Sequence, residues 1–136
     1  MRRSKLSSWV VLGLASLWLF SCAEDETDPG FSRNDYVGNW TMVETSGPNA
    51  PQNYIVNVTA GQAENEIKIK NFGNQGSAHT VVATVDATTF TIPVQTRDNL
   101  EYSGLGFPDG DLTQVRLEYT QNDGSGAADV RATMSR

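Results

Sequence analysis

Apolar and polar residues alternate in short runs along residues 31–136 of this 136-residue chain, and turn-forming residues separate the runs. Such alternation gives a β-strand one apolar and one polar face. The runs predict strands at 39–45, 53–60, 65–72, 79–86, 88–95, 99–106, 112–120 and 127–134. No stretch of about eleven residues keeps a helical period, and only 31–37 predicts one short helical turn.

One face of each predicted strand collects the apolar residues, which form the candidate core. They are Trp40, Met42, Tyr54, Val56, Val58, Ile67, Ile69, Val81, Ala83, Val85, Phe90, Ile92, Val94, Leu100, Tyr102, Val115, Leu117, Tyr119, Val130, Ala132 and Met134. The opposite faces carry polar residues, among them Arg116 and Arg131. One dry and one wet face are typical of antiparallel sheets. Sequential strands with short turns therefore predict an all-β fold, a small antiparallel up-and-down barrel of about eight strands.

Pro93 lies inside a predicted strand and has no N–H to give to a ladder. It indicates a bulge or a free edge, which leaves an open barrel or a two-sheet β-sandwich as alternatives to a closed barrel. The loop Ser46–Gln52 contains Gly47, Pro48 and Pro51 and is the long connection of the chain. We expect this loop beside the opening of the barrel.

The N-terminus has the pattern of an export signal. Met1–Lys5 is basic, and the apolar run Leu6–Phe20 is shorter than the ~20 residues that span a bilayer as a helix. This predicts a signal peptide over residues 1–21. Residues 22–30 follow with four acids, at positions 24, 25, 26 and 28, and end in Pro-Gly, which predicts an extended, solvated tether. Residues 31–136 then form the barrel domain.

The sequence Leu19-Phe20-Ser21-Cys22 resembles the lipobox of bacterial lipoproteins. The resemblance implies a diacylglyceryl thioether on Cys22, cleavage before it, and acylation of the freed amine by a fatty acid such as palmitate. No Asp follows the Cys, so the inner-membrane retention signal known in some Gram-negative bacteria is missing. The acidic run resembles the surface-export signal of Bacteroidota lipoproteins, with a generic linker as the alternative. We expect an outer-membrane lipoprotein, and the sequence leaves open which face of the outer membrane it occupies.

Gly38-Asn39-Trp40 opens the first strand and resembles the Gly-x-Trp motif of lipocalins. The resemblance implies that Gly38 and Trp40 form the barrel-closing motif. It also implies that an Arg from a late strand packs over the indole, a cation–π contact of about 0.5–2 kcal/mol; Arg116 and Arg131 are the candidates. Together, the lipobox, the acidic tether and this motif resemble the small lipocalin-like (calycin-type) lipoproteins of Bacteroidota.

Charge and residue counts exclude several classes of function. Residues 22–136 hold 7 basic and 16 acidic residues, a net charge of −9, which repels nucleic-acid phosphates and anionic lipid head groups. One Cys and one His make neither an internal disulfide nor a zinc site. We therefore expect no nucleic-acid partner, no metal and no cofactor. The membrane contact expected is through the lipid on Cys22.

No arrangement of residues suggests catalysis. We expect His79, the only His, to be solvated at the start of a strand. We place the candidate acids on the wet face or in turns: Glu44, Glu64, Glu66, Asp98, Glu101 and Glu118. The segments 109–111 and 123–125 have fewer ligands than an EF-hand loop and are interpreted as turns. We expect no catalytic residue and no enzyme activity.

Two classes of function remain. In the first, which we favour, Trp40, Tyr54, Phe90, Tyr102 and Tyr119 line a cavity for a small hydrophobic ligand. Small residues at inward positions, namely Ala83, Gly104 and Ala132, would leave room there. In the second, the core is solid and the domain binds an exported protein through loops or the edge near Pro93, as an accessory subunit or an inhibitor.

Overall fold

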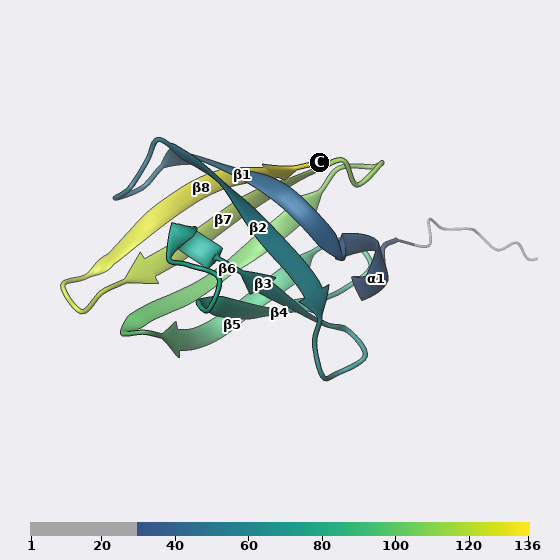
Figure 1. Cartoon of the computed structure of the whole chain (residues 1–136), viewed down its shortest axis with the longest axis horizontal. Coiled ribbons are helices and arrows are strands. Elements are labelled where there is room, and N and C mark those ends of the chain that lie inside the picture. Colours follow the sequence, from purple (N-terminus) through teal and green to yellow (C-terminus); the bar gives the residue numbers. More distant parts are fainter. Residues whose placement is uncertain (1–29) are drawn as a thin grey trace, which may run out of the picture.

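Eight antiparallel strands follow one another around a closed barrel in chain order (Figure 1). The computed structural model describes residues 30–136. The predicted signal peptide, Cys22 and the acidic tether up to residue 29 lie outside the described residues. The elements are α1 (Arg33–Tyr36), β1 (Gly38–Ser46), β2 (Gln52–Ala60), β3 (Glu66–Lys70), the 3-10 helix η1 (Phe72–Asn74), β4 (Thr80–Val85), β5 (Phe90–Arg97), β6 (Leu100–Pro108), β7 (Gln114–Asn122) and β8 (Ala127–Ser135).

The barrel closes because the last strand pairs with the first. Met134 of β8 lies opposite Met42 of β1, and every other pair of neighbouring strands is consecutive in the chain and antiparallel. The prediction of a small lipocalin-like up-and-down barrel is confirmed. The closed ladder rules out the open barrel and the two-sheet sandwich for the described residues.

Alternation along the strands builds the core. In β1, for example, Trp40 and Met42 are buried while Asn39 and Thr41 are exposed. The same alternation holds in β2, β4, β7 and β8, where the predicted inward residues are buried. Because a strand turns alternate side chains to opposite faces, each strand contributes every second residue to one shared interior.

The inward assignment of Val94 is wrong. Its side chain is 70% exposed, the most exposed of the large apolar residues of residues 30–136. The β5–β6 register shifts between Ile92 and Gln95, so β5 carries an extra residue at Pro93, and the prediction of a bulge there is confirmed. An extra residue reverses which side chains face inward, so Val94 points out and Gln95 becomes partly buried.

The third strand is shorter than the predicted 65–72. It ends at Lys70 because Asn71 adopts a left-handed backbone (φ 65°), and the chain then turns into η1. Figure 1 shows α1 at one end of the barrel and the short coil of η1, between β3 and β4, toward the other. None of the helices among residues 30–136 has the length and apolar character to cross a membrane.

Candidate functional site

Trp40 closes the α1 end of the barrel. Its side chain is 1% exposed, and its indole Nε1–H donates a hydrogen bond of 2.8 Å to the Tyr36 carbonyl. Gly38, two residues earlier, has φ 132°, a backbone conformation that favours glycine. The Gly-x-Trp motif therefore puts a glycine where the backbone φ is positive and a tryptophan where the end of the barrel is closed.

The cation over this indole is Arg136, so the assignment to Arg116 or Arg131 is wrong. The Arg136 guanidinium carbon lies 4.2 Å from the Trp40 ring centroid, and the same side chain donates to the Asp35 carbonyl at 2.8 Å. Arg116 instead covers Phe107 on the outside, at 4.5 Å. Arg131 is exposed, because it lies on the outer face of β8.

The five pocket candidates all point into the barrel, as predicted, but neighbouring groups occupy the space around them. Trp40, Phe90 and Tyr102 are at most 1% exposed, Tyr119 is 4% and Tyr54 is 8% exposed. The Phe90 ring lies where a Cβ on Gly106 would be, and Tyr119 fills the corresponding space at Gly104. Gly106 therefore allows the close approach of an aromatic ring, and Gly104 allows the close approach of the β7 backbone at Glu118 and Tyr119.

Phe72 of η1 seals the other end of the interior. It is 0% exposed, and its ring centroid lies 5.1 Å from that of Tyr102 and 4.8 Å from that of Tyr119. Asn71 holds this turn in place: its side chain donates to the Ile55 carbonyl and accepts from the Gly76 N–H. The loop Ser46–Gln52 also lies at this end, since Gln52 accepts a hydrogen bond from Asn74 of η1 at 3.2 Å, but the ring that enters the interior is that of Phe72.

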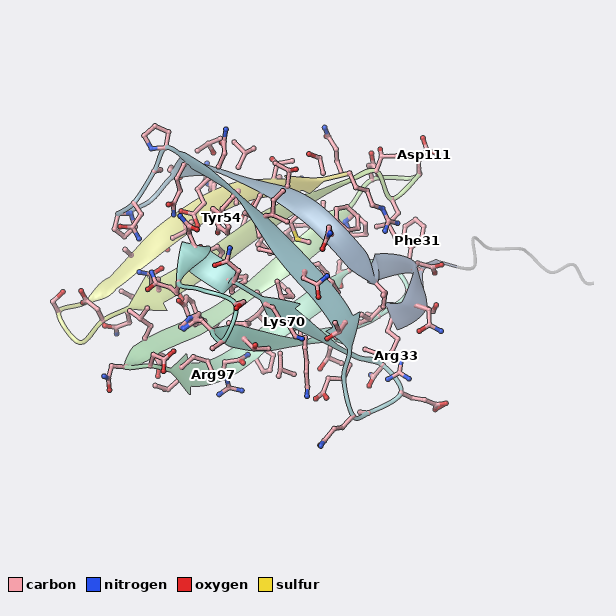
Figure 2. The ribbon with its side chains drawn as sticks, in the orientation of Figure 1. Phe31, Arg33, Tyr54, Lys70, Arg97 and Asp111 are labelled. Atoms are coloured by element: carbon pink, nitrogen blue, oxygen red, sulfur yellow. The ribbon has the colours of Figure 1, made fainter. Side chains whose placement is uncertain are left out.

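A buried carboxylate lies beside this aromatic cluster. Glu44 is 2% exposed, so its assignment to the wet face is wrong. One carboxylate oxygen accepts hydrogen bonds from the Tyr54 hydroxyl (2.6 Å) and the Tyr119 hydroxyl (2.9 Å), and the other accepts from the Gln52 amide (2.8 Å). Figure 2 shows Tyr54 near the end of the barrel that η1 covers. Hydrogen bonds from three neutral donors allow the carboxylate to stay buried.

His79 is also buried, at 2% exposure, and the expectation of a solvated strand-end His is wrong. Its Nδ1 lies 2.8 Å from the Asp98 carboxylate and its Nε2 lies 2.9 Å from the Tyr102 hydroxyl. Asp98 is in the β5–β6 turn, with its side chain 78% exposed. The imidazole therefore connects a surface carboxylate to an interior tyrosine, and both of its nitrogens are occupied.

The buried polar groups hydrogen-bond to one another. Burial, and then the hydrogen bond to Glu44, raises the pKa of Tyr54; burial, and then the neighbouring Tyr54 and Glu44, raises that of Tyr119. Both phenols are therefore neutral donors at physiological pH. Among residues 30–136, the Tyr36 hydroxyl is the one buried side-chain polar atom without a hydrogen-bond partner. The network is best suited to fixing the strands that contribute to it.

Raising the pH from about 10 to about 12 is expected to destabilise the barrel. Burial, with the charges of Glu44 and Asp98, raises the pKa of Tyr102 from 10.0 to about 12. Unfolded tyrosine ionises near pH 10, so the folded state holds more protons in this interval. The stability from the buried phenol is complete below pH 10 and is lost as the pH rises through about 12. Urea unfolding over this range measures the fall; Tyr102→Phe should reduce it, and a flat profile would contradict the assignment.

The hollows next to the barrel are at its surface. One of about 360 Å³ lies on the outer face of β6, β7 and β8, and another of about 550 Å³ lies beside α1; both are open to solvent. Of the five pocket candidates, Tyr119 lines the first hollow, and Trp40, Tyr54, Phe90 and Tyr102 line neither. No three His, Cys, Asp or Glu side chains within residues 30–136 gather as metal ligands.

Glu44, His79 and Phe72 are interior residues that were not predicted from the sequence. Glu44 is two residues after Met42, and His79 is two before Val81, so both lie in phase with buried neighbours. That phase indicates an inward position even though Glu and His are polar. Phe72 had no such signal, because it leaves the strand period at Asn71.

The fold and its interior define a small eight-stranded up-and-down β-barrel with a lipocalin-like layout. No family model matches the chain, and no curated protein matches it either.

Proposed function

We propose that this chain is an outer-membrane lipoprotein of a Gram-negative bacterium, related to the small lipocalin-like lipoproteins of Bacteroidota. Two features support this: the lipobox ending at Cys22, and a barrel whose first strand carries the Gly38 and Trp40 motif in its expected place. The acidic residues after Cys22 favour the cell surface. Two or three acyl chains on one residue are enough for stable anchoring.

Replacing Cys22 by alanine is expected to abolish lipidation. The substitution removes the thiol that would carry the diacylglyceryl group, so an alkyne fatty acid fed to expressing cells should label the wild-type chain and leave the variant unlabelled. Ser21→Ala is the matched control, because alanine is also small and keeps the lipobox. A variant labelled as strongly as the wild type would contradict the anchor.

The barrel itself acts, in this proposal, as a solid-cored module that binds an exported protein. The observation that carries it is the packing of Phe72 against Tyr102 and Tyr119, which fills the end of the interior where a ligand would enter. A carrier of small molecules needs a cavity of about 300 Å³ or more. A protein-binding module needs none, and it uses the strands and loops of the outer surface.

Fluorescence titration tests this choice. Trp40 is the only Trp of residues 22–136, so once the signal peptide is removed its emission reports on the interior. We expect no saturable change when a fatty acid, haem or a sterol analogue is added. A saturable change that Tyr102→Ala weakens would instead favour the small hydrophobic ligand predicted from the sequence.

A further inference from the structure

One seam of the barrel is closed largely by side chains. The backbones of β4 and β5 pair only at Thr84–Thr91 and Val85–Phe90. Beyond the bulge, the Gln95 carboxamide forms the hydrogen bonds that a backbone would otherwise form. Its oxygen accepts from the Val82 N–H at 2.9 Å, and its nitrogen donates to the Val82 carbonyl at 2.7 Å. A carboxamide presents the same donor and acceptor as a peptide group, so Gln95 stands where another strand's backbone would be.

Arg97 also supplies a side-chain hydrogen bond to this edge of β4 where a backbone bond is missing. Its Nε–H donates to the Thr80 carbonyl at 2.8 Å. Neighbouring strands in a sheet lie about 4.7–4.9 Å apart, and a glutamine side chain between two backbones requires a wider spacing. The edge of β4 from Thr80 to Val82 is thus a strand edge whose partners, Gln95 and Arg97, are side chains that can rotate away.

Three basic side chains lie beside this edge, with Glu66 two residues before Lys68 on β3 and Asp98 next to Arg97. Lys68 and Lys70 of β3 lie directly opposite Val82 and Thr80, and they are the only lysines of residues 30–136. Neither forms an ion pair within the described part of the chain. Figure 2 shows Lys70 and Arg97 on the same side of the barrel. In a chain with 16 acidic and 10 basic residues, a local group of three cations is a specific attraction for negative charge.

An apolar contact adjoins the edge. Val94, turned outward by the bulge, is 70% exposed on the β5 side of the seam. The seam thus combines backbone hydrogen-bonding groups, three cations and one exposed apolar side chain.

We propose that an extended, acidic segment of a partner protein adds to the Thr80–Val82 edge of β4 as a new strand. Its peptide groups replace the Gln95 carboxamide and the Arg97 guanidinium, and its acidic side chains lie against Lys68 and Lys70. Exchanging one amide for another costs little, because each hydrogen bond lost is re-formed. The inference rests on the proposed function, since it names the surface by which the module binds its partner.

The test uses the full chain in detergent and a fluorescent eight-residue peptide that alternates valine and glutamate. Anisotropy should show saturable binding, at least tenfold weaker for a peptide with lysine in place of glutamate. Gln95→Ala should bind the glutamate peptide about tenfold more tightly, because it removes the internal competitor. Lys68→Gln with Lys70→Gln should bind it about tenfold more weakly. Thr96→Ala, an exposed neighbour of Gln95, is the matched control and should bind as the wild type does.

Amide hydrogen exchange on the wild-type chain gives a readout that needs no variant to fold. Saturating glutamate peptide should slow exchange of the Val82 amide and leave that of Thr84, already in the ladder, unchanged. The proposal is overturned if the Val82 amide does not slow, or if the glutamate and lysine peptides bind equally. Equal or tighter binding by a peptide with the sequence of residues 23–30 would also overturn it, since the chain's own acidic segment would then be the occupant.

The experiments distinguish a failure of the solid-cored module from a failure of strand addition at β4. A saturable Trp40 response to a fatty acid would contradict the solid-cored module whatever the peptide does. Absence of peptide binding with an unresponsive Trp40 would remove only strand addition at β4 and leave the module in place.

Discussion

Replacing Trp40 by alanine lowers the free energy of unfolding by about 3–5 kcal/mol, the range for removing a large aromatic side chain from a packed core. Trp40 is 1% exposed and closes the barrel beside α1. Its loss leaves the Tyr36 carbonyl without its indole donor and the Arg136 guanidinium without its ring. Urea unfolding followed by circular dichroism measures the change.

The matched control is Arg136→Ala, which removes the cation and keeps the indole. Because Arg136 is exposed, we expect a loss of only about 0.5–1 kcal/mol. A Trp40→Ala variant that loses less than Arg136→Ala would show that this end of the barrel is not packed as described.

Replacing Phe72 by alanine is expected to lower the free energy of unfolding by about 3–5 kcal/mol and to open the interior. The ring packs against both Tyr102 and Tyr119, so its removal leaves an apolar space bordered by two aromatic side chains. Apolar cavities of this kind stay dry and bind small aromatic molecules such as benzene. Thermal unfolding with and without benzene should show stabilisation of Phe72→Ala and none of the wild type.

Phe107→Ala is the matched control for this experiment. Phe107 is only partly buried, and its ring lies under Arg116 on the outside of β6. Its loss should cost less stability and create no site for benzene. Equal stabilisation of the wild type by benzene would contradict the description of Phe72 as filling the interior.

The period of two predicted the strands and their inner faces because side-chain direction in a strand is fixed by the backbone. Closure of the barrel was harder to predict from the sequence, because it depends on the pairing of β1 with β8, the two strands farthest apart in the sequence. Pro93 was the one local sign of irregularity, and it did mark a bulge. Its consequence for Val94 could not be seen from type alone, because one extra residue changes the phase of everything after it.

The buried polar residues show a second reason why the sequence alone could not predict the interior. Glu44 is in phase with Trp40 and Met42, yet a carboxylate is costly to bury unless donors surround it. Those donors are Tyr54, on the next strand, and Tyr119, 75 residues further along the chain. Local pattern could place Glu44 on the inner face, but only the assembled barrel brings the donors to it. The same holds for Arg136, which reaches Trp40 from the other end of the described chain.

Only part of the description of the seam between β4 and β5 could be predicted from the sequence. An edge near Pro93 was one of the surfaces considered for a partner. That Gln95 substitutes for a backbone depends on how far the bulge separates the two strands, which no spacing in the sequence encodes.

Xenon pressure on crystals of the wild-type barrel tests the central claim, a filled interior, most directly. Xenon enters apolar cavities and is visible in electron density. We expect no xenon inside the wild-type barrel and a bound atom next to Tyr102 and Tyr119 in Phe72→Ala. A xenon atom inside the wild-type barrel would show an interior with space for a ligand, contrary to a solid-cored binding module.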